Sequence, residues 1–140
     1  MLFEDFFKKY SEGFYVAFRV IIGLLFFFHG MQKFGFIGDA NVSGFAGMFG
    51  LPYFLAWLIA FAELAGGLGI LLGFFTRFNA LFGALIMLGA LIMVHLPKGW
   101  YPLGNGSEVA LLNLAAFLVL MVWGAGQLSL EKALLKKEVF

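Results

Sequence analysis

The sequence predicts an all-α membrane protein: a bundle of four transmembrane helices with a short interfacial segment in the first outer loop. Of its 140 residues 63% are hydrophobic and only 12% are charged, and the mean hydropathy is +0.99. A soluble domain of this size could not bury so much apolar surface, so the composition indicates an integral membrane protein. Four stretches reach the length of about 20 apolar residues that a helix needs to cross a bilayer: residues 14–34, 51–75, 78–96 and 109–126.

These spans use most of the chain, so we expect a single membrane domain, residues 1–140. A short mixed-charge segment precedes the first span, and no small-residue cleavage pattern follows the span, so it is not expected to be a signal peptide. The first outer loop, residues 35–50, is apolar and rich in glycine. We expect it to form a short interfacial segment, capped by Ser43, that lies as a lid over the outer mouth of the bundle.

The basic residues predict the orientation. Four spans place both termini on one side, which carries Lys8, Lys9, Arg77, Lys132, Lys136 and Lys137, against Lys33 and Lys98 on the other side. The positive-inside rule then predicts a multi-pass protein of the prokaryotic plasma (inner) membrane with both termini in the cytoplasm. Arg19, within the first span, could extend to the inner headgroups, and Arg77 is expected to anchor at the membrane interface.

Small residues are predicted to form the contacts between spans, because lipid supplies no hydrophobic drive and close van der Waals contact must replace it. Gly23 and Gly30 lie one heptad apart on the first span, and Gly66 and Gly69 recur on the second. These glycines indicate a tight bundle. They do not indicate a nucleotide site, since no strand precedes them.

Several chemistries are excluded or disfavoured. The chain has no cysteine, which removes disulfides, thiol relays and iron–sulfur clusters. A net charge of +1 gives no case for nucleic acid. His29, His95, Glu63 and Glu108 differ in expected depth and lack the spacing of a di-iron bundle, so no metal site is expected.

Polar residues inside the spans form the candidate site. Glu63 lies in the middle of residues 51–75, and a carboxylate there must be protonated, wetted or paired with a cation. His29 and Lys33 share one helix face, so either is a partner for Glu63, with Asn113 next. The candidate ligand-binding residues are His29, Gln32, Lys33, Glu63, His95, Glu108 and Asn113.

Simpler interpretations stay open for these residues. Lys33 would serve equally as an interface anchor, His95 and Glu108 flank a loop and would be solvated there, and Glu63 would fit a structural ion pair. Counting the rise per residue along straight helices places Glu63 near mid-bilayer and deeper than Lys33. Five aromatic residues are expected to line a pocket around the polar groups: Phe26, Phe45, Phe49, Trp57 and Phe61.

The ordered motifs resemble those of the DoxX family over nearly the whole chain. They are Gly23-x5-His29-Gly30-x-Gln32-Lys33, Gly50-Leu51-Pro52, Glu63-Leu64-x-Gly66-Gly67, Leu71-Leu72-Gly73-x2-Thr76-Arg77, His95, Glu108 and Gly124-x-Gly126-x-Leu128-Ser129-Leu130. Members commonly end this last motif in Ser-Leu-Asp, where this chain has Glu131. The resemblance implies a four-helix inner-membrane protein related to the membrane subunit of thiosulfate:quinone oxidoreductase and to other redox-linked membrane proteins.

Two functions remain as hypotheses. The first is a membrane subunit of a redox system that binds a quinone or lipid-like ligand in an outward-facing pocket and receives electrons from a redox partner protein. The chain would then not be an enzyme alone, and we assign no catalytic residue and no covalent cofactor. The second is a non-enzymatic scaffold or small-solute carrier whose polar cluster is structural. The lipid bilayer is an expected partner under both hypotheses, and homo-oligomerisation is left open.

Overall fold

The computed structural model describes residues 2–137, and all regular secondary structure in that range is helical. Its elements are α1 (Leu2–Lys33), α2 (Val42–Phe49), α3 (Tyr53–Leu72), α4 (Thr76–Ala90), the π-helical turn η1 (Leu91–His95), the 3-10 turn η2 (Leu96–Lys98), α5 (Pro102–Asn105), α6 (Glu108–Trp123) and α7 (Leu130–Leu135). Three helices are long and apolar enough to cross a membrane: α1, α3, and α4 with its continuation to Lys98. The fourth predicted span corresponds to α6, an apolar helix of only 16 residues.

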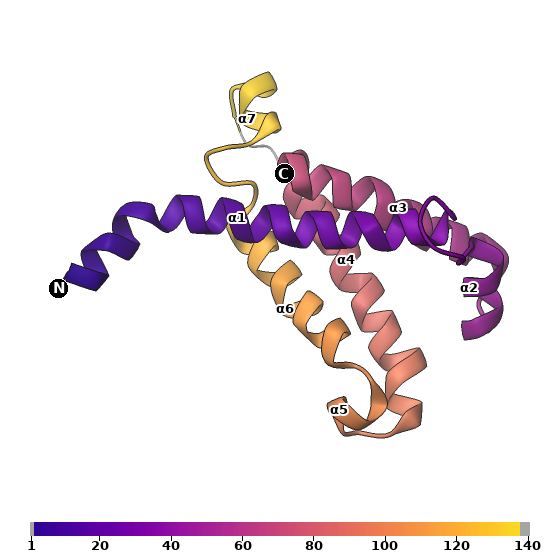
Figure 1. Ribbon diagram of the computed structural model, residues 1–140. Coiled ribbons are helices and arrows are strands. Elements are labelled where there is room, and N and C mark those ends of the chain that lie inside the picture. The colour runs from indigo at the N-terminus through magenta and orange to yellow at the C-terminus, as the bar shows by residue number, and fades with distance from the viewer. Residues whose placement is uncertain (1, 138–140) are drawn as a thin grey trace.

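The four long helices form two pairs that diverge. Helix α1 lies beside α3, and α4 lies beside α6; the pairs meet near the α3–α4 turn and separate toward α2 and α5 (Figure 1). A buried apolar cluster joins the pairs, with Phe26 of α1 and Ile70 of α3 packed against Ala84 of α4 and Phe117 of α6. The rings of Phe26 and Phe117 meet edge to face with centroids 4.9 Å apart. The architecture is therefore joined at one end and open at the other.

Glycines bring the backbones of α1 and α3 into direct contact. A Cβ atom added at Gly30 would lie 2.3 Å from the backbone nitrogen of Leu64, and one added at Gly23 would lie 2.4 Å from that of Leu71. From the opposite side, a Cβ at Gly67 would lie 2.2 Å from the nitrogen of Phe27. Real Cβ atoms never approach backbone so closely, so only glycine fits at these positions. The prediction that Gly23 and Gly30 pack against another span is confirmed, whereas on α3 the glycine against α1 is Gly67, next to the predicted Gly66.

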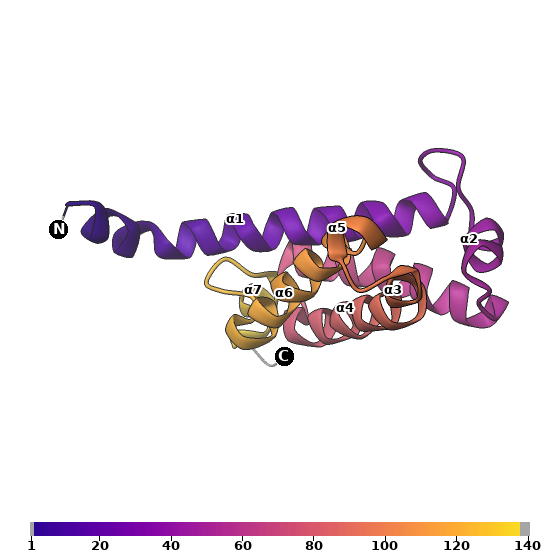
Figure 2. The ribbon, with the colours of Figure 1, turned by 90° about the horizontal axis from the view of Figure 1, so that it is seen from below.

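Helix α1 begins well before the predicted span, at Leu2 instead of residue 14. The charged residues of the N-terminal segment lower its hydropathy, yet they are good helix formers, so the helix continues through them. Glu4 and Lys8, four residues apart, form an exposed ion pair of 2.6 Å. Figure 2 shows this part of α1 extending beyond the other helices.

The predicted interfacial segment exists as α2, but its cap is not Ser43. Asn41 is the N-cap, in extended conformation, and its side-chain oxygen accepts a hydrogen bond of 2.8 Å from the backbone nitrogen of Gly44. Helix α2 ends at Gly50, whose φ of 61° suits glycine. Val42 and Ala46 of α2 bury against Ala56 and Ala60 of α3, which fixes α2 beside the outer end of α3.

Helix α4 changes its winding before Pro97. Proline has no backbone N–H to donate to the preceding turn and its ring crowds that turn. In the structure α4 continues as the π-helical turn η1 and then tightens to η2, with Pro97 inside it. Neither change of winding was anticipated from the sequence, although Pro97 is a signal for one.

Side chains of α1 hold the segment that follows α6. The Tyr15 hydroxyl donates a hydrogen bond of 2.6 Å to the carbonyl of Gly124, and Arg19 donates to the carbonyls of Ala125 and Leu128. Arg19 is buried, so the expectation that it extends to the inner headgroups is wrong. Unpaired carbonyls beyond a helix end offer a buried guanidinium the acceptors that it needs.

Arg77 has a similar role, not that of an interface anchor. Its guanidinium donates to the carbonyls of Met121 and Val122 in the last turn of α6, at 3.2 and 3.4 Å. A cation in that position complements the negative end of the helix dipole. The joined end of the two pairs is thus stabilised by arginine–carbonyl contacts as well as by apolar packing.

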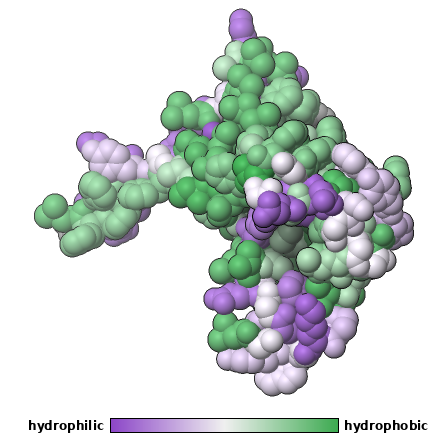
Figure 3. Space-filling view, turned by 45° about the vertical axis from the view of Figure 1, so that its right-hand side comes forward, coloured by the Kyte–Doolittle hydropathy of each residue, from purple (hydrophilic) through white to green (hydrophobic). Residues whose placement is uncertain are grey.

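The surface agrees with a protein surrounded by lipid. Hydrophobic residues cover most of the face seen in Figure 3, and hydrophilic residues gather at its lower end, over α5 and the loops beside it. Large apolar side chains such as Ile21, Leu85 and Val122 are more than half exposed on α1, α4 and α6. A soluble protein would bury such residues, whereas lipid solvates them.

We predict that Gly30→Ala destabilises the protein by about 1–3 kcal/mol, the usual range for overpacking a close contact. The added methyl group would meet the backbone of Leu64 and push α1 away from α3. Gly13→Ala on the same helix is the matched control, because nothing lies within 4 Å of a Cβ added there. Unfolding of the reconstituted protein by a denaturing detergent measures both, and equal stability of the two variants would contradict this account of the interface.

Candidate functional site

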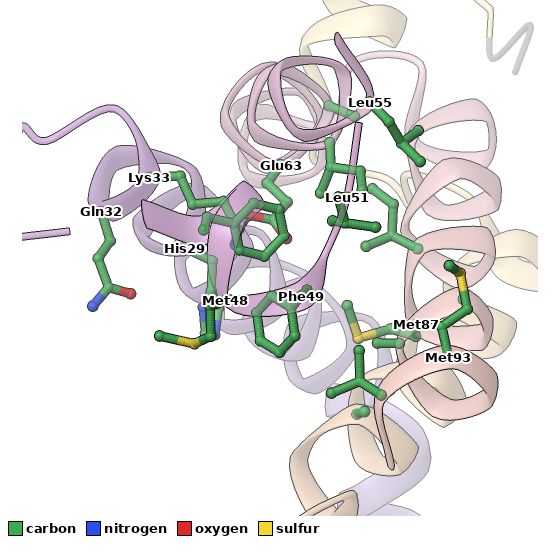
Figure 4. A pocket seen from close by; sticks show the side chains of 18 of the residues that line it. His29, Gln32, Lys33, Met48, Phe49, Leu51, Leu55, Glu63, Met87 and Met93 are labelled. Atoms are coloured by element: carbon green, nitrogen blue, oxygen red, sulfur yellow. Dashed lines mark hydrogen bonds and ion pairs between the residues drawn. The ribbon is translucent and has the colours of Figure 1, made fainter. Parts of the chain in front are cut away.

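A cavity of about 860 Å³ lies between the two helix pairs at their open end. Its walls come from α1, α2, α3, α4, η1 and α6, and Figure 4 shows the side chains that line it. One wall, from α1 and α3, carries His29, Lys33 and Glu63. The facing wall from α4 and η1 is mostly apolar, with Met87 and Met93, and carries His95 at its end. Such a volume with few polar groups is typical of a small-molecule site.

Lys33 and Glu63 form a buried ion pair on the polar wall. The Lys33 Nζ lies 2.5 Å from a carboxylate oxygen of Glu63, and the two side chains are only 12% and 5% exposed. The pairing follows from the glycine contact, because Gly30 meets Leu64 and therefore places Lys33 one turn further along, beside Glu63. The prediction that another helix satisfies Glu63 is confirmed, and Lys33 is the partner.

Two expectations are corrected by this ion pair. Lys33 is not an interface anchor, since its ammonium is buried against α3. Glu63 also lies at the level of Lys33, not below it, because the register of the two antiparallel helices sets its depth. Counting residues along isolated spans could not have given that register.

Helix α2 covers the ion pair. The Lys33 Nζ lies 4.6 Å from the centre of the Phe45 ring, within the range of a cation–π contact. Phe45 and Phe49 of α2 also pack against each other, with centroids 5.2 Å apart, and both line the cavity. The predicted lid therefore has a specific place: it closes one side of the cavity over Lys33.

His29 and Gln32 lie on α1 at the edge of the cavity. Gln32 points away from the ion pair in Figure 4. Both residues also line a second, smaller hollow of about 300 Å³ together with Ile37 and Gly38 of the outer loop. His29 therefore stands between the cavity and the outer loop.

The π-helical turn brings His95 to the cavity. Its Nδ1 lies 3.0 Å from the carbonyl oxygen of Asn105, a buried residue whose side-chain amide donates to the carbonyl of Gly99. His95 is thus held by the connection between α4 and α6, and the expectation that it is merely solvated does not fit this contact. Helical turns of this kind recur at functional sites.

The remaining two candidates differ. Asn113 of α6 lines the cavity, but its side chain is not recorded in contact with Glu63. Glu108, at the start of α6, is exposed and lies outside the cavity wall. Six of the seven predicted site residues therefore surround one cavity, and Glu108 does not. Whether any of them binds a ligand stays a prediction.

The aromatic part of the predicted pocket is partly wrong. Phe26, Phe45 and Phe49 line the cavity as expected, whereas Trp57 and Phe61 do not. Phe61 is 60% exposed on the outer face of α3, and Trp57 packs against Phe34. The helical register of α3 could have shown this, because at 3.6 residues per turn Phe61 and Trp57 point well away from the face that carries Glu63. The wall that α4 contributes, including Phe82, was not anticipated.

Within residues 2–137 no group of three or more His, Asp or Glu side chains is arranged to hold a metal ion. His95 is engaged with the backbone of Asn105, and Glu63 is engaged with Lys33. The site therefore combines one ion pair, two imidazoles and a large apolar volume.

Comparison with known proteins identifies the family. The DoxX family model matches residues 14–96, which carry α1 through η1 and most of the cavity wall. The chain belongs to the DoxX family. It is 36% identical over 118 residues to "Putative oxidoreductase CatD" of Bacillus subtilis, covering 84% of each chain.

Other DoxX-type relatives match almost from end to end. "Inner membrane protein YqjF" of Escherichia coli is 32% identical over 133 residues, covering 93% of this chain and 98% of the relative. An uncharacterised protein of Haemophilus influenzae is also 32% identical over 133 residues, covering 93% and 97%. No solved structure matches this chain. The family, the apolar helices and these relatives together establish a DoxX-type membrane protein.

We predict that Glu63→Leu lowers the free energy of unfolding by about 3–5 kcal/mol, because it leaves the Lys33 ammonium buried without its counter-charge. The double variant Lys33→Met with Glu63→Leu should recover most of that loss, since no charge is then buried. Detergent-induced unfolding of the single and double variants gives the coupling between the two residues. Additive effects would show that the ion pair does not stabilise the native protein.

Proposed function

We propose that this DoxX protein is an integral membrane subunit of a redox-linked complex that binds a quinone or lipid-like ligand in the cavity between its two helix pairs. The cavity is the observation that carries the proposal. It offers about 860 Å³ of mostly apolar space, with the Lys33–Glu63 ion pair and His29 on one wall and His95 on another. Such a space suits a ligand with a small polar head and an apolar body.

The polar groups suit the chemistry of a quinone. Reduction of a quinone takes up protons together with electrons, so its carbonyl oxygens need hydrogen-bond donors and a route for protons. Lys33 and Glu63 supply a donor and a carboxylate within one pair. His29 stands between the cavity and the hollow beside the outer loop, a suitable place for proton exchange.

Electrons must come from a partner. The chain has no cysteine to hold an iron–sulfur cluster and no flavin-binding motif. We therefore infer a redox partner protein and no catalytic activity of the chain alone. The name of the Bacillus subtilis relative, "Putative oxidoreductase CatD", supports a redox setting without specifying the reaction.

A four-span topology completes the proposal. Helix α6 is about 24 Å long at 1.5 Å per residue, which is shorter than the hydrocarbon core of about 30 Å. We count it as the fourth span because it packs beside α4, which is long enough to cross the membrane. With four spans both termini share one side. Lys33 is buried in its ion pair, so Lys98 is the remaining lysine on the opposite side, and the bias favours cytoplasmic termini in the plasma membrane.

A second function is favoured by one observation. Glu63 and Lys33 satisfy each other, and a fully paired carboxylate and ammonium can be purely structural. The protein would then be a membrane scaffold or a small-solute carrier, with lipid in the cavity. The two functions differ in what the cavity holds and in whether redox turnover depends on it.

The ligand can be identified and its place tested together. Mass spectrometry of gently solubilised protein should find a quinone, and Gly89→Phe should lower its occupancy by about tenfold, the factor that corresponds to 1.4 kcal/mol. Gly89 lines the cavity and has nothing within 4 Å of an added Cβ, so the new ring has room there. Gly13→Phe, far from the cavity on α1, is the control. Ordinary phospholipid alone in both variants would favour the scaffold.

Glu63→Gln in the native complex distinguishes a role of the carboxylate in proton transfer from a purely structural role. The amide keeps the shape and one hydrogen bond to Lys33 but cannot carry a proton, so quinone-linked turnover should fall. Lys33 also loses its counter-charge, so some stability should be lost, but less than in Glu63→Leu because the hydrogen bond remains. Turnover and detergent stability are measured side by side. Unchanged turnover with a large loss of stability would identify Glu63 as a structural ion-pair member and select the scaffold function.

The orientation is tested with single cysteines, for which the chain offers a background with no native thiol. Lys137→Cys should be protected from an impermeant thiol reagent in intact cells, and Lys98→Cys should react, because the basic bias places these residues on opposite sides. Permeabilised cells provide the control for reactivity. The reverse labelling pattern would invert the proposed topology.

A further inference from the structure

The first turns of α1 lie apart from the rest of the structure. The level at which the helix pairs are joined is marked by Tyr15 and Arg19, which hold the segment after α6. Further toward the N-terminus, Glu12 accepts a hydrogen bond from the backbone nitrogen of Gln127. No described residue of α1 before Glu12 has a hydrogen bond to another helix or loop. Residues 2–11 therefore extend beyond the joined end, and α1 bends there (Figures 1 and 2).

An aromatic stripe runs along this extension. Phe3, Phe7, Tyr10 and Phe14 follow the spacing of one helix face, and they are 80%, 53%, 46% and 54% exposed. Phe6 lies beside them and contacts Tyr10 with ring centroids 4.8 Å apart. Exposed aromatic rings at this density are not stable in water.

The stripe continues the surface by which α1 faces lipid. Eighteen residues make five turns of an α-helix, so residues separated by 18 positions point in the same direction. Four pairs of exposed apolar residues share this spacing: Phe3 and Ile21, Phe6 and Leu24, Phe7 and Leu25, and Tyr10 and Phe28. The second member of each pair lies within the membrane-spanning part of α1, on the face turned away from α3.

The polar residues of the extension also lie 18 positions before residues of known orientation. Asp5, Lys8 and Glu12 lie 18 residues before Gly23, Phe26 and Gly30. Those three are buried in the bundle, with the two glycines against α3. The extension is therefore amphipathic, and its polar side points to the side of α1 on which the bundle lies.

Length decides where this segment can lie. Helix α1 has 32 residues and is about 48 Å long, whereas the hydrocarbon core is about 30 Å thick. An extension standing upright would carry its aromatic stripe into water. We propose that residues 2–14 of α1 form a membrane-surface anchor, lying along the headgroup region on the side of the termini with the aromatic stripe in lipid.

The aromatic stripe contacts lipid, and insertion of its apolar rings, not attraction between charges, holds the extension at the membrane. The polar face carries Glu4, Asp5 and Glu12 against Lys8 and Lys9, a net charge of −1, and Glu4 already pairs with Lys8. Anionic headgroups therefore gain no attraction from this face. Aromatic rings, in contrast, are favoured at the headgroup level. A second copy of the chain is disfavoured as the occupant because the stripe is continuous with the lipid-facing surface.

The test uses nitroxide labels on single cysteines in the reconstituted full chain. Phe3→Cys and Phe7→Cys report the stripe, and Asp5→Cys and Lys9→Cys are matched controls one or two positions away on the polar face. Oxygen concentrates in lipid and a chelated nickel relaxer stays in water. The ratio of oxygen to nickel accessibility should be several-fold larger at the stripe than at the polar face. The result should be the same in phosphatidylcholine vesicles with and without phosphatidylglycerol.

Each other outcome would overturn the anchor. High nickel accessibility on both faces would show the extension standing in water. Shielding of the stripe from both relaxers, with dipolar broadening between labelled chains, would show a second copy on it. A dependence on phosphatidylglycerol would show electrostatic attachment instead of apolar insertion. Unfolding midpoints of the four labelled proteins, all altered at exposed positions, should match that of the unlabelled chain.

Discussion

The backbone contact between α1 and α3 is the constraint on which the site depends. Lipid tails are as apolar as leucine side chains, so moving an apolar side chain from lipid into a helix interface gains no hydrophobic free energy. Two helices in a membrane therefore associate through close van der Waals packing. Gly30 and Gly67 remove the side chains that would prevent it, each leaving room for the backbone of the other helix. Because Gly30 meets Leu64, the neighbouring Glu63 comes within 2.5 Å of Lys33 one turn further on. The packing register and the ion pair are thus one feature.

The ion pair in turn gives the cavity its polarity. Among the described residues that line the cavity, Lys33 is the single lysine or arginine, and Glu63 largely neutralises it. An ion pair in a medium of low dielectric is strongly coupled, so neither charge is available to a distant ligand without affecting the other. His29, on the same helix face as Lys33, remains turned to the cavity. The site therefore presents a charged, paired wall opposite a mostly apolar one that carries His95, an arrangement suited to an amphipathic ligand.

The sequence predicted the parts of this structure that depend on local composition. Hydropathy located the apolar helices, glycine spacing located the α1–α3 contact, and the isolated carboxylate Glu63 indicated a cationic partner. The error over Trp57 and Phe61 came from ignoring the register of α3. Glu63 marks its inward face, and residues two and six positions before Glu63 point well away from that face. Hydropathy placed the start of the first span at residue 14. The helix itself begins earlier, at Leu2, because charged residues such as glutamate and lysine continue it.

The two arginines within the bundle, Arg19 and Arg77, lie at the joined end of the helix pairs and not at the cavity. Arg19 and Arg77 hold backbone carbonyls at the joined end of the helix pairs, where the segment after α6 has no helical partner for them. That end is rigid because its polar groups are satisfied and its apolar core, around Phe117, is fully buried. The opposite end has no such closure: the pairs separate, and α2 covers the space between them through Phe45. A cavity built on one closed end and one lidded end can admit a ligand at the open end of the helix pairs without disturbing the packing at the joined end. Lys33 therefore has two roles in this arrangement. Its ammonium joins α1 to α3 through Glu63, and its side chain lines the cavity in which we propose that the ligand binds.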